Sequence, residues 1–353
     1  MMKTASRILH VDADNFFASC EGILSPALHG RALIVAGGRR QNGFVLSANR
    51  RAKQSGVKSG MACFMARRLC AELVVCPARV DEYKIISARM FAAMNRFSPL
   101  VVQVSIDEGF LDLSAEVDGA ARWRELSVTV LREVGLQLSG GLANSRWLCK
   151  LATDAAAKPG FLEVSAGTEK DFLSARDLRE LSGIGESRAQ ALAALGARTF
   201  GDVAALPSML LRQRFGIWGQ KLWLFANGDW PEKLVAEVRS RTMISRQKTF
   251  PFDVIDYGRV LRFGLAEVKK LMDVLRREQL LPRELGVVVR FADFSEARAE
   301  HRFRAAQERD EIICEMFAAK FRECMSGQTK SVRQLRVALW NLSPRPAQGL
   351  LFP

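Results

Sequence analysis

The sequence predicts an α+β protein with several domains. Its 353 residues exceed what one compact hydrophobic core usually organises, so two to four domains are expected. Strand-like and helical segments alternate over residues 7–160, and from about residue 168 short helices are separated by glycines. Residues 245–342 return to alternating strands and helices. These three patterns predict a mixed region, a small helical unit and a second mixed region.

The elements of the first region follow from the spacing of apolar residues and from the residues that end each segment. Glycines and the Lys158-Pro159-Gly160 stretch mark ends, because glycine and proline interrupt regular structure. The expected elements are, in order, a strand turning into a helix at 7–18, strands at 31–36 and 44–48, helical structure over 49–75 interrupted at Gly56 and Gly60, a helix at 81–97, a hairpin at Ser105–Asp112, a helix at 119–136, a strand at 137–143 and a helix at 144–157.

The second half of the chain contains the helical unit and the second mixed region. The helical unit is predicted to end near Trp230, and the charged residues 231–244, which lack a clear period, are expected to form a linker. The elements expected after the linker are a helix at 257–279, a strand at 285–291, a helix at 307–325 and a strand at 332–339. Residues 343–353 contain prolines and end in an apolar run, so a flexible tail is expected there.

The charge of the chain predicts a polyanionic partner. The net charge is +14, from 52 Lys or Arg against 38 Asp or Glu. The C-terminal third, residues 231–353, supplies half of this excess, with 23 basic and 16 acidic residues. Nucleic acid is the expected partner, because no convincing basic amphipathic helix of the membrane-binding kind is present.

Cysteine usage and hydropathy predict a cytoplasmic protein. The seven cysteines are scattered without a C-x-x-C pair, and only three histidines are present, which disfavours a zinc site and predicts reduced thiols. No signal peptide is visible, and no apolar run approaches the roughly 18 residues of a membrane span.

Two acidic pairs stand among apolar residues that are typical of strands. Asp12 and Asp14 end the run that begins at Ile8, and Asp107 and Glu108 lie between two short apolar runs. Adjacent carboxylates in such a setting are costly unless a cation or hydrogen bonds compensate. If the two strands are neighbours, Asp12, Asp107 and Glu108 form a cluster suited to Mg²⁺ and to two-metal phosphoryl transfer. The alternative is that they are ordinary solvated loop acids.

Aromatic and basic residues near these acids are typical of a triphosphate site. Phe16 and Phe17 follow Asp12 at a strand-to-helix turn, where backbone amides can hold phosphate oxygens and a ring can wall off a sugar. The alternative is that both rings belong to the core. The cations that could pair with a triphosphate are Arg50, Arg51, Lys53, Lys58, Lys150 and Lys158. For most of them a solvated helix face is the simpler interpretation.

Two further motifs indicate contacts with macromolecules. Gly183-Ile184-Gly185 lies between two short helices, so its amides can bind a DNA backbone phosphate without reading bases. In a basic chain it resembles a helix-hairpin-helix element, although such a turn often only joins two helices. The segment Gln348–Phe352 can dock apolar side chains into a partner's pocket, or it is simply a frayed terminus.

Taken in order, these motifs resemble the Y family of low-fidelity translesion DNA polymerases. The match runs over nearly the whole chain and is carried by His10–Glu21, Asp81–Lys84, Ser105–Asp112, Gly183–Gly185 with Thr199–Val203, and Arg214–Gly216. The length and the basic C-terminal third are similar to the bacterial DinB type. Residues 18–21 and Lys53 are more similar to UmuC, so the subfamily stays open at this point.

The resemblance implies a fold like a right hand, with a ferredoxin-like palm, small fingers, a helical thumb that contains the helix-hairpin-helix, and a C-terminal α/β little finger. The implied domains are the palm at 1–15 and 80–167, the fingers at 16–79, the thumb at 168–230, the linker at 231–244, the little finger at 245–342 and the tail at 343–353.

The resemblance also implies roles for individual residues. Asp12, Asp107 and Glu108, with the Ala13 carbonyl, would hold two Mg²⁺ ions, which Mn²⁺ can replace. Phe17 would be the steric gate against ribonucleotides. The implied nucleotide contacts are Phe16, Phe17, Arg50, Lys53, Tyr83 and Lys158, the implied DNA contacts are Gly183, Gly185 and Lys248, and the implied sliding-clamp contacts are Gln348, Leu350, Leu351 and Phe352.

Several positions depart from the family pattern, among them Gly109 and Phe110 in place of the more usual Ala and Tyr, and Gly349 in place of the usual Leu of the tail. Arg50 and Lys53 stand where DinB-type members have a Tyr and an Arg, and Lys cannot reproduce bidentate contact with a phosphate. Arg146 stands where Lys is common, which keeps the charge.

The expected function is template-directed, low-fidelity DNA synthesis from dNTPs on a primer-template, by a monomeric catalytic chain. No second acidic constellation is evident, so a proofreading exonuclease is not expected. The alternatives are a non-catalytic Y-family scaffold, a nucleotidyl cyclase and a DNA-binding repair accessory. The intact acids disfavour the scaffold, the charge and helical unit disfavour the cyclase, and the buried carboxylates disfavour the accessory.

Overall fold

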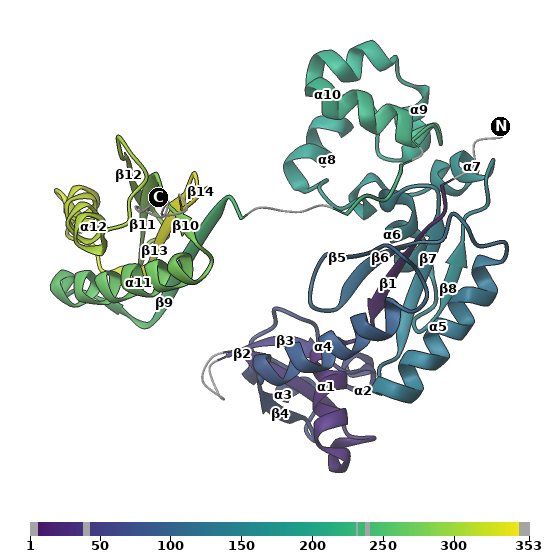
Figure 1. Cartoon of the computed structure of the whole chain (residues 1–353), viewed down its shortest axis with the longest axis horizontal. Coiled ribbons are helices and arrows are strands. Elements are labelled where there is room, and N and C mark those ends of the chain that lie inside the picture. Colours follow the sequence, from purple (N-terminus) through teal and green to yellow (C-terminus); the bar gives the residue numbers. More distant parts are fainter. Residues whose placement is uncertain (1–5, 38–42, 231, 237–240, 346–353) are drawn as a thin grey trace, which may run out of the picture. The chain divides into compact units, whose positions relative to one another are not determined.

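The chain divides into two compact units, Met1–Glu237 and Val238–Pro353 (Figure 1). The computed structural model describes residues 6–37, 43–230, 232–236 and 241–345. Within these ranges, none of the helices is both long enough and apolar enough to cross a membrane.

A five-stranded sheet forms the centre of the first unit (Figure 1). Its strands, in spatial order, are β5 Val101–Gln103, β6 Glu108–Asp112, β1 Ile8–Ala13, β7 Leu138–Ala143 and β8 Phe161–Glu163. Strand β1 pairs along both of its edges, with β6 and β7, and α6 packs against it, so every residue of β1 except Asp12 is buried. The predicted strands at the start of the chain and at 137–143 are therefore confirmed.

Three helices pack against this sheet and confirm the helices predicted for this part of the chain. They are α4 Val80–Met94, α5 Gly119–Val134 and α6 Arg146–Ala155. Helix α6 lies directly on β7 because Gly141 has no side chain. A Cβ at that position would come within 2.1 Å of the Cys149 carbonyl oxygen. This close approach fixes the face of α6 that points toward β1.

A smaller sheet, with strand order β3-β2-β4, follows the first helix of the chain. Its strands are β2 Leu33–Gly37, β3 Phe44–Ala48 and β4 Val74–Pro77, and the nearby helices are α1 Phe16–Leu24, α2 Arg50–Gln54 and α3 Cys63–Leu69. The prediction of helical structure over 49–75 is correct only for α2 and α3. Val74 and Val75 instead begin a strand parallel to β2, where their β-branched side chains fit a pleated surface.

The helical unit predicted after residue 168 is confirmed. It contains α7 Glu169–Ser174, α8 Glu186–Ala193, α9 Phe200–Ala205 and α10 Ser208–Ala226. Its core is shared with residues of α6, including Leu148 and Leu151. Within the range expected to be a linker, Leu234 is buried in this core, and β9 already begins at Met243.

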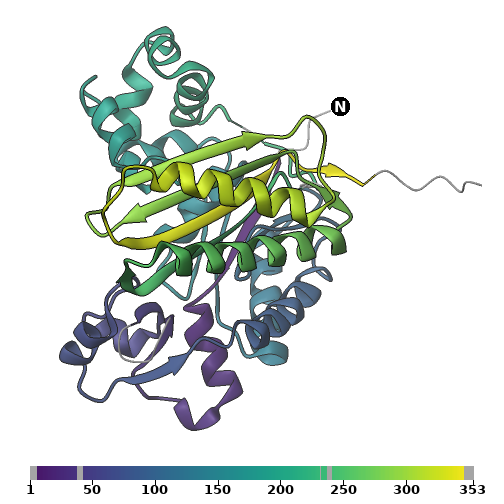
Figure 2. The same cartoon turned by 90° about the vertical axis from the view of Figure 1, so that its left-hand side faces the viewer.

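The second unit is a four-stranded antiparallel sheet with two helices on one face (Figure 2). The strand order is β12 Glu296–Arg302, β11 Glu284–Phe291, β13 Val332–Trp340 and β9 Met243–Val254, and the helices are α11 Tyr257–Arg277 and α12 Asp310–Met325. Alternate residues of β11, from Leu285 to Phe291, are buried under these helices. The predicted order of strands and helices over 245–342 is confirmed.

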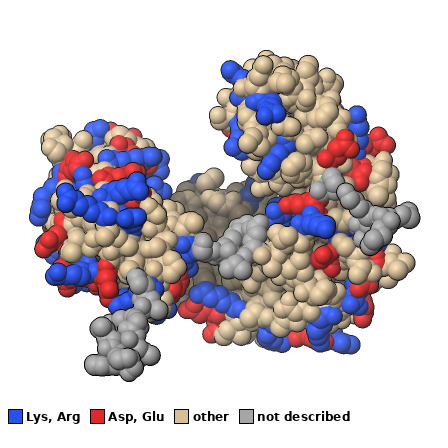
Figure 3. Space-filling model, turned by 45° about the horizontal axis from the view of Figure 1, so that its top comes forward, with Lys and Arg blue, Asp and Glu red and all other residues tan. Residues whose placement is uncertain are grey.

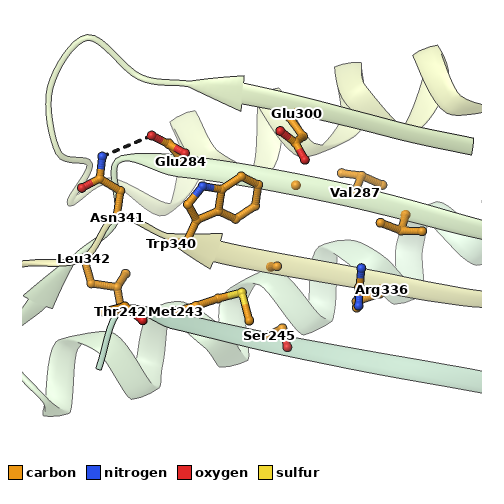
Figure 4. A pocket seen from close by; sticks show the side chains of 13 residues that line it. Thr242, Met243, Ser245, Glu284, Val287, Glu300, Arg336, Trp340, Asn341 and Leu342 are labelled. Carbon is orange, nitrogen blue, oxygen red and sulfur yellow. Dashed lines mark hydrogen bonds between the residues drawn. The ribbon is translucent and has the colours of Figure 1, made fainter. Parts of the chain in front are cut away.

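The opposite, helix-free side of this sheet carries a pocket of about 830 Å³ (Figure 4). The Trp340 ring lies over Gly286, where a Cβ would come within 2.5 Å of the ring. Glu284 and Glu300 lie beside the ring and Arg336 lies farther along β13. None of the predicted site residues lines this pocket.

The C-terminal segment begins with regular structure. Ser343–Pro344 forms β14, which pairs with β10 Leu280–Leu281, so the expectation of a flexible tail from residue 343 is wrong for these two residues. The backbone hydrogen bonds of this short pairing hold the chain against the end of α11. The predicted clamp contacts Gln348, Leu350, Leu351 and Phe352 lie outside the described residues.

Candidate active site

The two acidic pairs lie at adjacent ends of the neighbouring strands β1 and β6, which is the condition on which the predicted carboxylate cluster depends. In the antiparallel register of β1 and β6, Asp12 lies directly opposite Glu108. The Ala13 backbone N–H donates to the Asp107 carbonyl at 2.9 Å, so the ladder continues past the end of β6. Opposed residues in an antiparallel pair have Cβ atoms about 4.5–5.5 Å apart, so Asp12 and Glu108 approach closely at one edge of the sheet.

Lysines neutralise two of these carboxylates. Lys158 Nζ lies 2.7 Å from Asp12 Oδ2, and Lys150 Nζ lies 2.5 Å from Glu108 Oε2. Asp107 accepts a hydrogen bond from the hydroxyl of Ser105. With the side chains turned to these partners, no three of the described His, Cys, Asp and Glu residues are grouped to hold a metal ion. The donor chemistry nevertheless fits Mg²⁺, because the residues that meet here offer carboxylate and carbonyl oxygens.

A buried histidine, His10, lies next to the Glu108 carboxylate. His10 is only 1% exposed, and its Nδ1 lies 2.9 Å from the hydroxyl oxygen of Thr153 on α6. Its Nε2 lies 3.6 Å from Glu108 Oε2 and has no hydrogen-bond partner among the described residues. The His10 ring and the Lys150 ammonium hold the pKa of Glu108 at about 2, against its usual 4.5. Glu108 is therefore ionised at neutral pH.

The pKa values of two further groups near the site are shifted. Burial raises the pKa of Asp14, although the hydroxyl of Ser139 donates to its carboxylate at 2.9 Å. Burial opposes the charge of Lys158, but the hydrogen bond and negative charge of Asp12 outweigh it and raise the lysine's pKa. Lys158 is therefore a cation at neutral pH.

A pocket of about 260 Å³ opens between this sheet edge and the smaller sheet. Its lining combines acidic, basic and aromatic residues, which include Asp12, Asp107, Lys53, Lys158, Phe16 and Phe17. An adjoining pocket of about 200 Å³ is lined by Arg50 as well as Lys53 and Lys158. The structure thus places two of the three predicted carboxylates, Asp12 and Asp107, around one space with both predicted lysines and both phenylalanines, and Arg50 lies at its margin. Glu108 lies opposite Asp12 on β6 but does not line either pocket.

The turn that places the two phenylalanines depends on Asn15. Its φ of 52° lies in the left-handed region, which Asn tolerates better than most side chains. Helix α1 begins immediately afterwards, so the backbone N–H groups of Phe16 and Phe17 belong to its first turn. The Phe16 side chain is buried in the core, whereas Phe17 is half-buried at the pocket.

Tyr83 does not reach the pocket, which corrects the expectation that it contacts the nucleotide. Its side chain is fully buried and its hydroxyl donates to Glu21, which also accepts two hydrogen bonds from Arg79. The Phe17 ring stacks on the Tyr83 ring at 4.9 Å between centroids. Tyr83 therefore packs against the Phe17 ring and does not itself line the pocket.

Sequence reasoning missed Lys150 and His10. A solvated helix face is the simpler interpretation of Lys150 from the sequence, but in the structure Lys150 pairs with Glu108. Arg146, which stands where lysine is common, pairs with Glu232 at 2.6 Å. Helical spacing could have indicated both contacts, because Lys150 and Thr153 are three residues apart and therefore share one face of α6. In the structure Thr153 contacts His10 and Lys150 contacts Glu108.

The predicted DNA contacts are exposed at the surface of each unit. Gly183 has a φ of 101°, and Gly185 precedes α8 with open space around its Cα. Lys248 is exposed on the edge strand β9 of the second unit. Basic and acidic side chains are interspersed over the visible face of that unit (Figure 3). Within the same unit, Arg298 pairs with Glu296 at 2.7 Å.

Comparisons with known proteins agree with this arrangement. The impB/mucB/samB family model matches residues 11–154, and the model of that family's C-terminal domain matches residues 241–351. DNA polymerase IV of Salmonella typhimurium is 31% identical over 302 residues, covering 84% of this chain and 86% of the relative. DNA polymerase IV of Desulfatibacillum aliphaticivorans is 31% identical over 297 residues, covering 82% of this chain and 74% of the relative.

Solved structures share the fold at lower sequence identity. A chimera of the Y-family DNA polymerases Dbh and Dpo4 aligns with a TM-score of 0.86 and 23% identity, covering 96% of this chain and 100% of that one. The crystal structure of DinB from Sulfolobus solfataricus aligns with a TM-score of 0.61 and 23% identity, covering 95% and 98%. These structures confirm the predicted right-hand fold, and the relatives decide the subfamily. The chain belongs to the Y family of translesion DNA polymerases, is of the DinB type, and is a DNA-directed DNA polymerase.

Proposed function

We propose that this chain extends a primer on a DNA template by nucleotidyl transfer at the edge of the five-stranded sheet. The observation that carries the proposal is the β1–β6 register, which sets Asp12 opposite Glu108 beside a pocket lined with basic and aromatic residues. Y-family polymerases depend on divalent metal ions, and the oxygen donors here are of the kind that Mg²⁺ prefers.

In this proposal Asp12, Asp107 and Glu108, with the Ala13 carbonyl, would hold two Mg²⁺ ions. Such a pair of ions makes the primer 3′-hydroxyl a better nucleophile and neutralises the leaving pyrophosphate. The carboxylates supply the negative charge that gathers the ions, and the lowered pKa of Glu108 keeps its oxygens unprotonated.

The pocket would receive the dNTP. Lys53 and Lys158, which line both adjoining pockets, would pair with phosphate oxygens, and the amides of Phe16 and Phe17 at the start of α1 would donate to them. Arg50 lies at the margin, where it would reach the outer phosphates. The half-buried Phe17 ring would close the space beside the 2′-carbon of the sugar and so exclude ribonucleotides.

The remaining contacts would position DNA. The amides at Gly183 and Gly185 and the exposed Lys248 would bind backbone phosphates, and the tail residues Gln348, Leu350, Leu351 and Phe352 would bind a sliding clamp. One of the solved structures that share this fold is an insertion ternary complex of Dbh DNA polymerase. We further propose that the chain works without proofreading, because no second acidic constellation like that of Asp12, Asp107 and Glu108 is evident in the sequence.

The test is primer extension by the purified full chain on undamaged and damaged templates. Asp107→Ala and Glu108→Ala should each reduce the rate of single-nucleotide incorporation by several orders of magnitude, while Asp81→Ala, an exposed acid paired with Lys84, should leave it unchanged. Undiminished activity in either site variant would refute the proposal. A wild-type chain that binds DNA without extending it would support the scaffold alternative.

A further inference from the structure

The two lysines that pair with the proposed metal carboxylates come from one stretch of chain. Lys150 lies in α6, and Lys158 lies three residues after the end of that helix at Ala155. Their contacts with Glu108 and Asp12, at 2.5 Å and 2.7 Å, are direct charge-assisted hydrogen bonds. All four side chains are partly buried, with exposed fractions between 23% and 40%, so solvent screens these pairs less than it screens ordinary surface pairs.

The third carboxylate, that of Asp107, is not paired with any lysine that the structure describes. Asp107 is held by the neutral hydroxyl of Ser105, and in the described part of the chain it makes no ion pair with a lysine or arginine. It also lines the pocket. The three acids therefore differ in their availability, since only Asp107 can accept a cation without first giving one up.

A carboxylate oxygen that binds Mg²⁺ at about 2.0–2.1 Å cannot keep an ammonium group at hydrogen-bond distance on the same side. Lys150 and Lys158 would therefore withdraw when a metal ion takes the oxygens that they hold, Glu108 Oε2 and Asp12 Oδ2. For Lys158 the structure offers two other positions. Asp154 Oδ1 already lies 3.9 Å from its Nζ, and the pocket that it lines would contain the phosphates of a bound dNTP.

We propose that Lys150 and Lys158 are built-in counter-ions that compete with the divalent metal for Glu108 and Asp12, and that the move of Lys158 from Asp12 to the nucleotide phosphates couples nucleotide binding to metal binding. The inference rests on the proposed function, because it assumes the same carboxylates and the same pocket. Each ligand then raises the affinity of the other by the same factor, since coupling between two sites is reciprocal.

The test measures Mn²⁺ binding to the full chain by electron paramagnetic resonance of the free ion. Titrations are made without DNA, with and without a dNTP, and the Mn²⁺ bound by the dNTP alone is subtracted. Without nucleotide, Lys158→Gln and Lys150→Gln should each bind Mn²⁺ more tightly than the wild type, by about fivefold or more. The gain in affinity caused by the dNTP should shrink in Lys158→Gln and persist in Lys150→Gln.

Three variants separate a direct contact from a general effect of charge. Lys158→Arg keeps the cation and should keep the weak wild-type affinity for Mn²⁺. Lys53→Gln removes a positive charge from the same pocket without breaking either carboxylate pair, so its effect should be smaller. Lys84→Gln removes an exposed cation that pairs with Asp81 and should have no effect.

The outcomes also separate this inference from the proposed function. If Asp107→Asn weakens Mn²⁺ binding but neither lysine variant tightens it, the counter-ion proposal is wrong and the metal site stands. If Asp107→Asn leaves Mn²⁺ binding unchanged, the metal site is wrong and both proposals fail. Circular dichroism melting curves that match the wild type show that each variant is folded.

Discussion

Phe17 combines a position at the pocket with a fixed orientation. One face of its ring stacks on Tyr83, whose hydroxyl is held by Glu21, so the ring is supported by a buried hydrogen-bond network. A gate made from a supported aromatic ring discriminates by shape, because it cannot turn aside at low cost.

Phe17→Ala should admit ribonucleotides. Removing the ring opens space beside the 2′-carbon, so the ratio of kcat/KM for rNTP to that for dNTP should rise by at least about tenfold, the scale of a steric difference in a pocket. Tyr83→Phe keeps the supporting ring and removes only the hydroxyl, so it serves as the matched control and should shift the ratio far less. Continued rejection of rNTPs by Phe17→Ala would remove its role as the gate.

Glu21 also makes stability depend on pH. Burial opposes its ionisation, but hydrogen bonds from Arg79 and Tyr83 hold its pKa below the usual 4.5. A carboxyl whose pKa is depressed in the folded state stabilises the fold above its unfolded pKa, and this contribution is lost as the pH falls through the folded value. Glu21→Gln should therefore lower the free energy of unfolding at neutral pH by about 1–3 kcal/mol.

The check is urea unfolding of both chains from pH 7 to as far below pH 4.5 as both remain folded, because the folded pKa of Glu21 lies below 4.5. The stability difference between the wild type and Glu21→Gln should narrow as the solution is acidified below about pH 4.5. A stability difference that stays constant over this range would show that Glu21 stabilises the fold by packing and not by its negative charge.

At the scale of elements, the contact of α6 with β7 determines the geometry of the site. Helix α6 carries Lys150 and Thr153 and leads to Lys158, so a shift of this helix displaces three groups at once. Gly141→Ala should force such a shift, because its Cβ would meet the Cys149 carbonyl oxygen at 2.1 Å. A loss of about 1–3 kcal/mol in unfolding free energy and a lower incorporation rate are expected.

Thermal unfolding and primer extension of Gly141→Ala test this prediction. Gly22→Ala is the matched control, because its Cβ would be 3.5 Å from His29 in ordinary contact and the change favours helix α1. If Gly141→Ala were as stable and as active as the control, the close packing of α6 would not determine the site.

The elements that could be predicted are those with a long, clear period. Helix α5 and strand β11 match their predicted ranges closely, whereas β4 was missed because a four-residue apolar run does not distinguish strand from helix. The apolar runs indicated that Asp12, Asp107 and Glu108 lie at the ends of strands, but their meeting was predicted only on the condition that the two strands are neighbours. Strand order does not follow from the pattern of apolar residues, and the resemblance to the Y family supplied it. The burial of Tyr83 and the pairing of Lys150 could not be predicted, because side-chain direction depends on packing between elements that lie far apart in sequence.

At the scale of the whole molecule, the charge of +14 should make DNA binding strongly dependent on salt. The basic excess is shared between the units, and in the second unit many arginines are already paired with glutamates, as Arg298 is with Glu296. Exposed cations without such partners should therefore dominate the salt dependence, and Lys248 is the candidate on β9.

Lys248→Ala should weaken binding to primer-template uniformly across sequences and reduce the slope of log Kd against log salt by about 1. Fluorescence anisotropy over a range of salt concentrations measures this slope, with Lys84→Ala, a cation paired with Asp81, as the control. An unchanged slope in Lys248→Ala would exclude a phosphate contact at this position.

In the proposed mechanism, Asp12, Asp107 and Glu108 form one metal site for nucleotidyl transfer. A crystal structure of the chain with primer-template, a non-reactive dNTP and Mg²⁺ tests it most directly. We expect oxygens of all three side chains at about 2.0–2.1 Å from metal ions, with Lys158 moved from Asp12 to the phosphates. Metal ions bound elsewhere, or Asp12 out of reach of the metal that Asp107 and Glu108 hold, would contradict it.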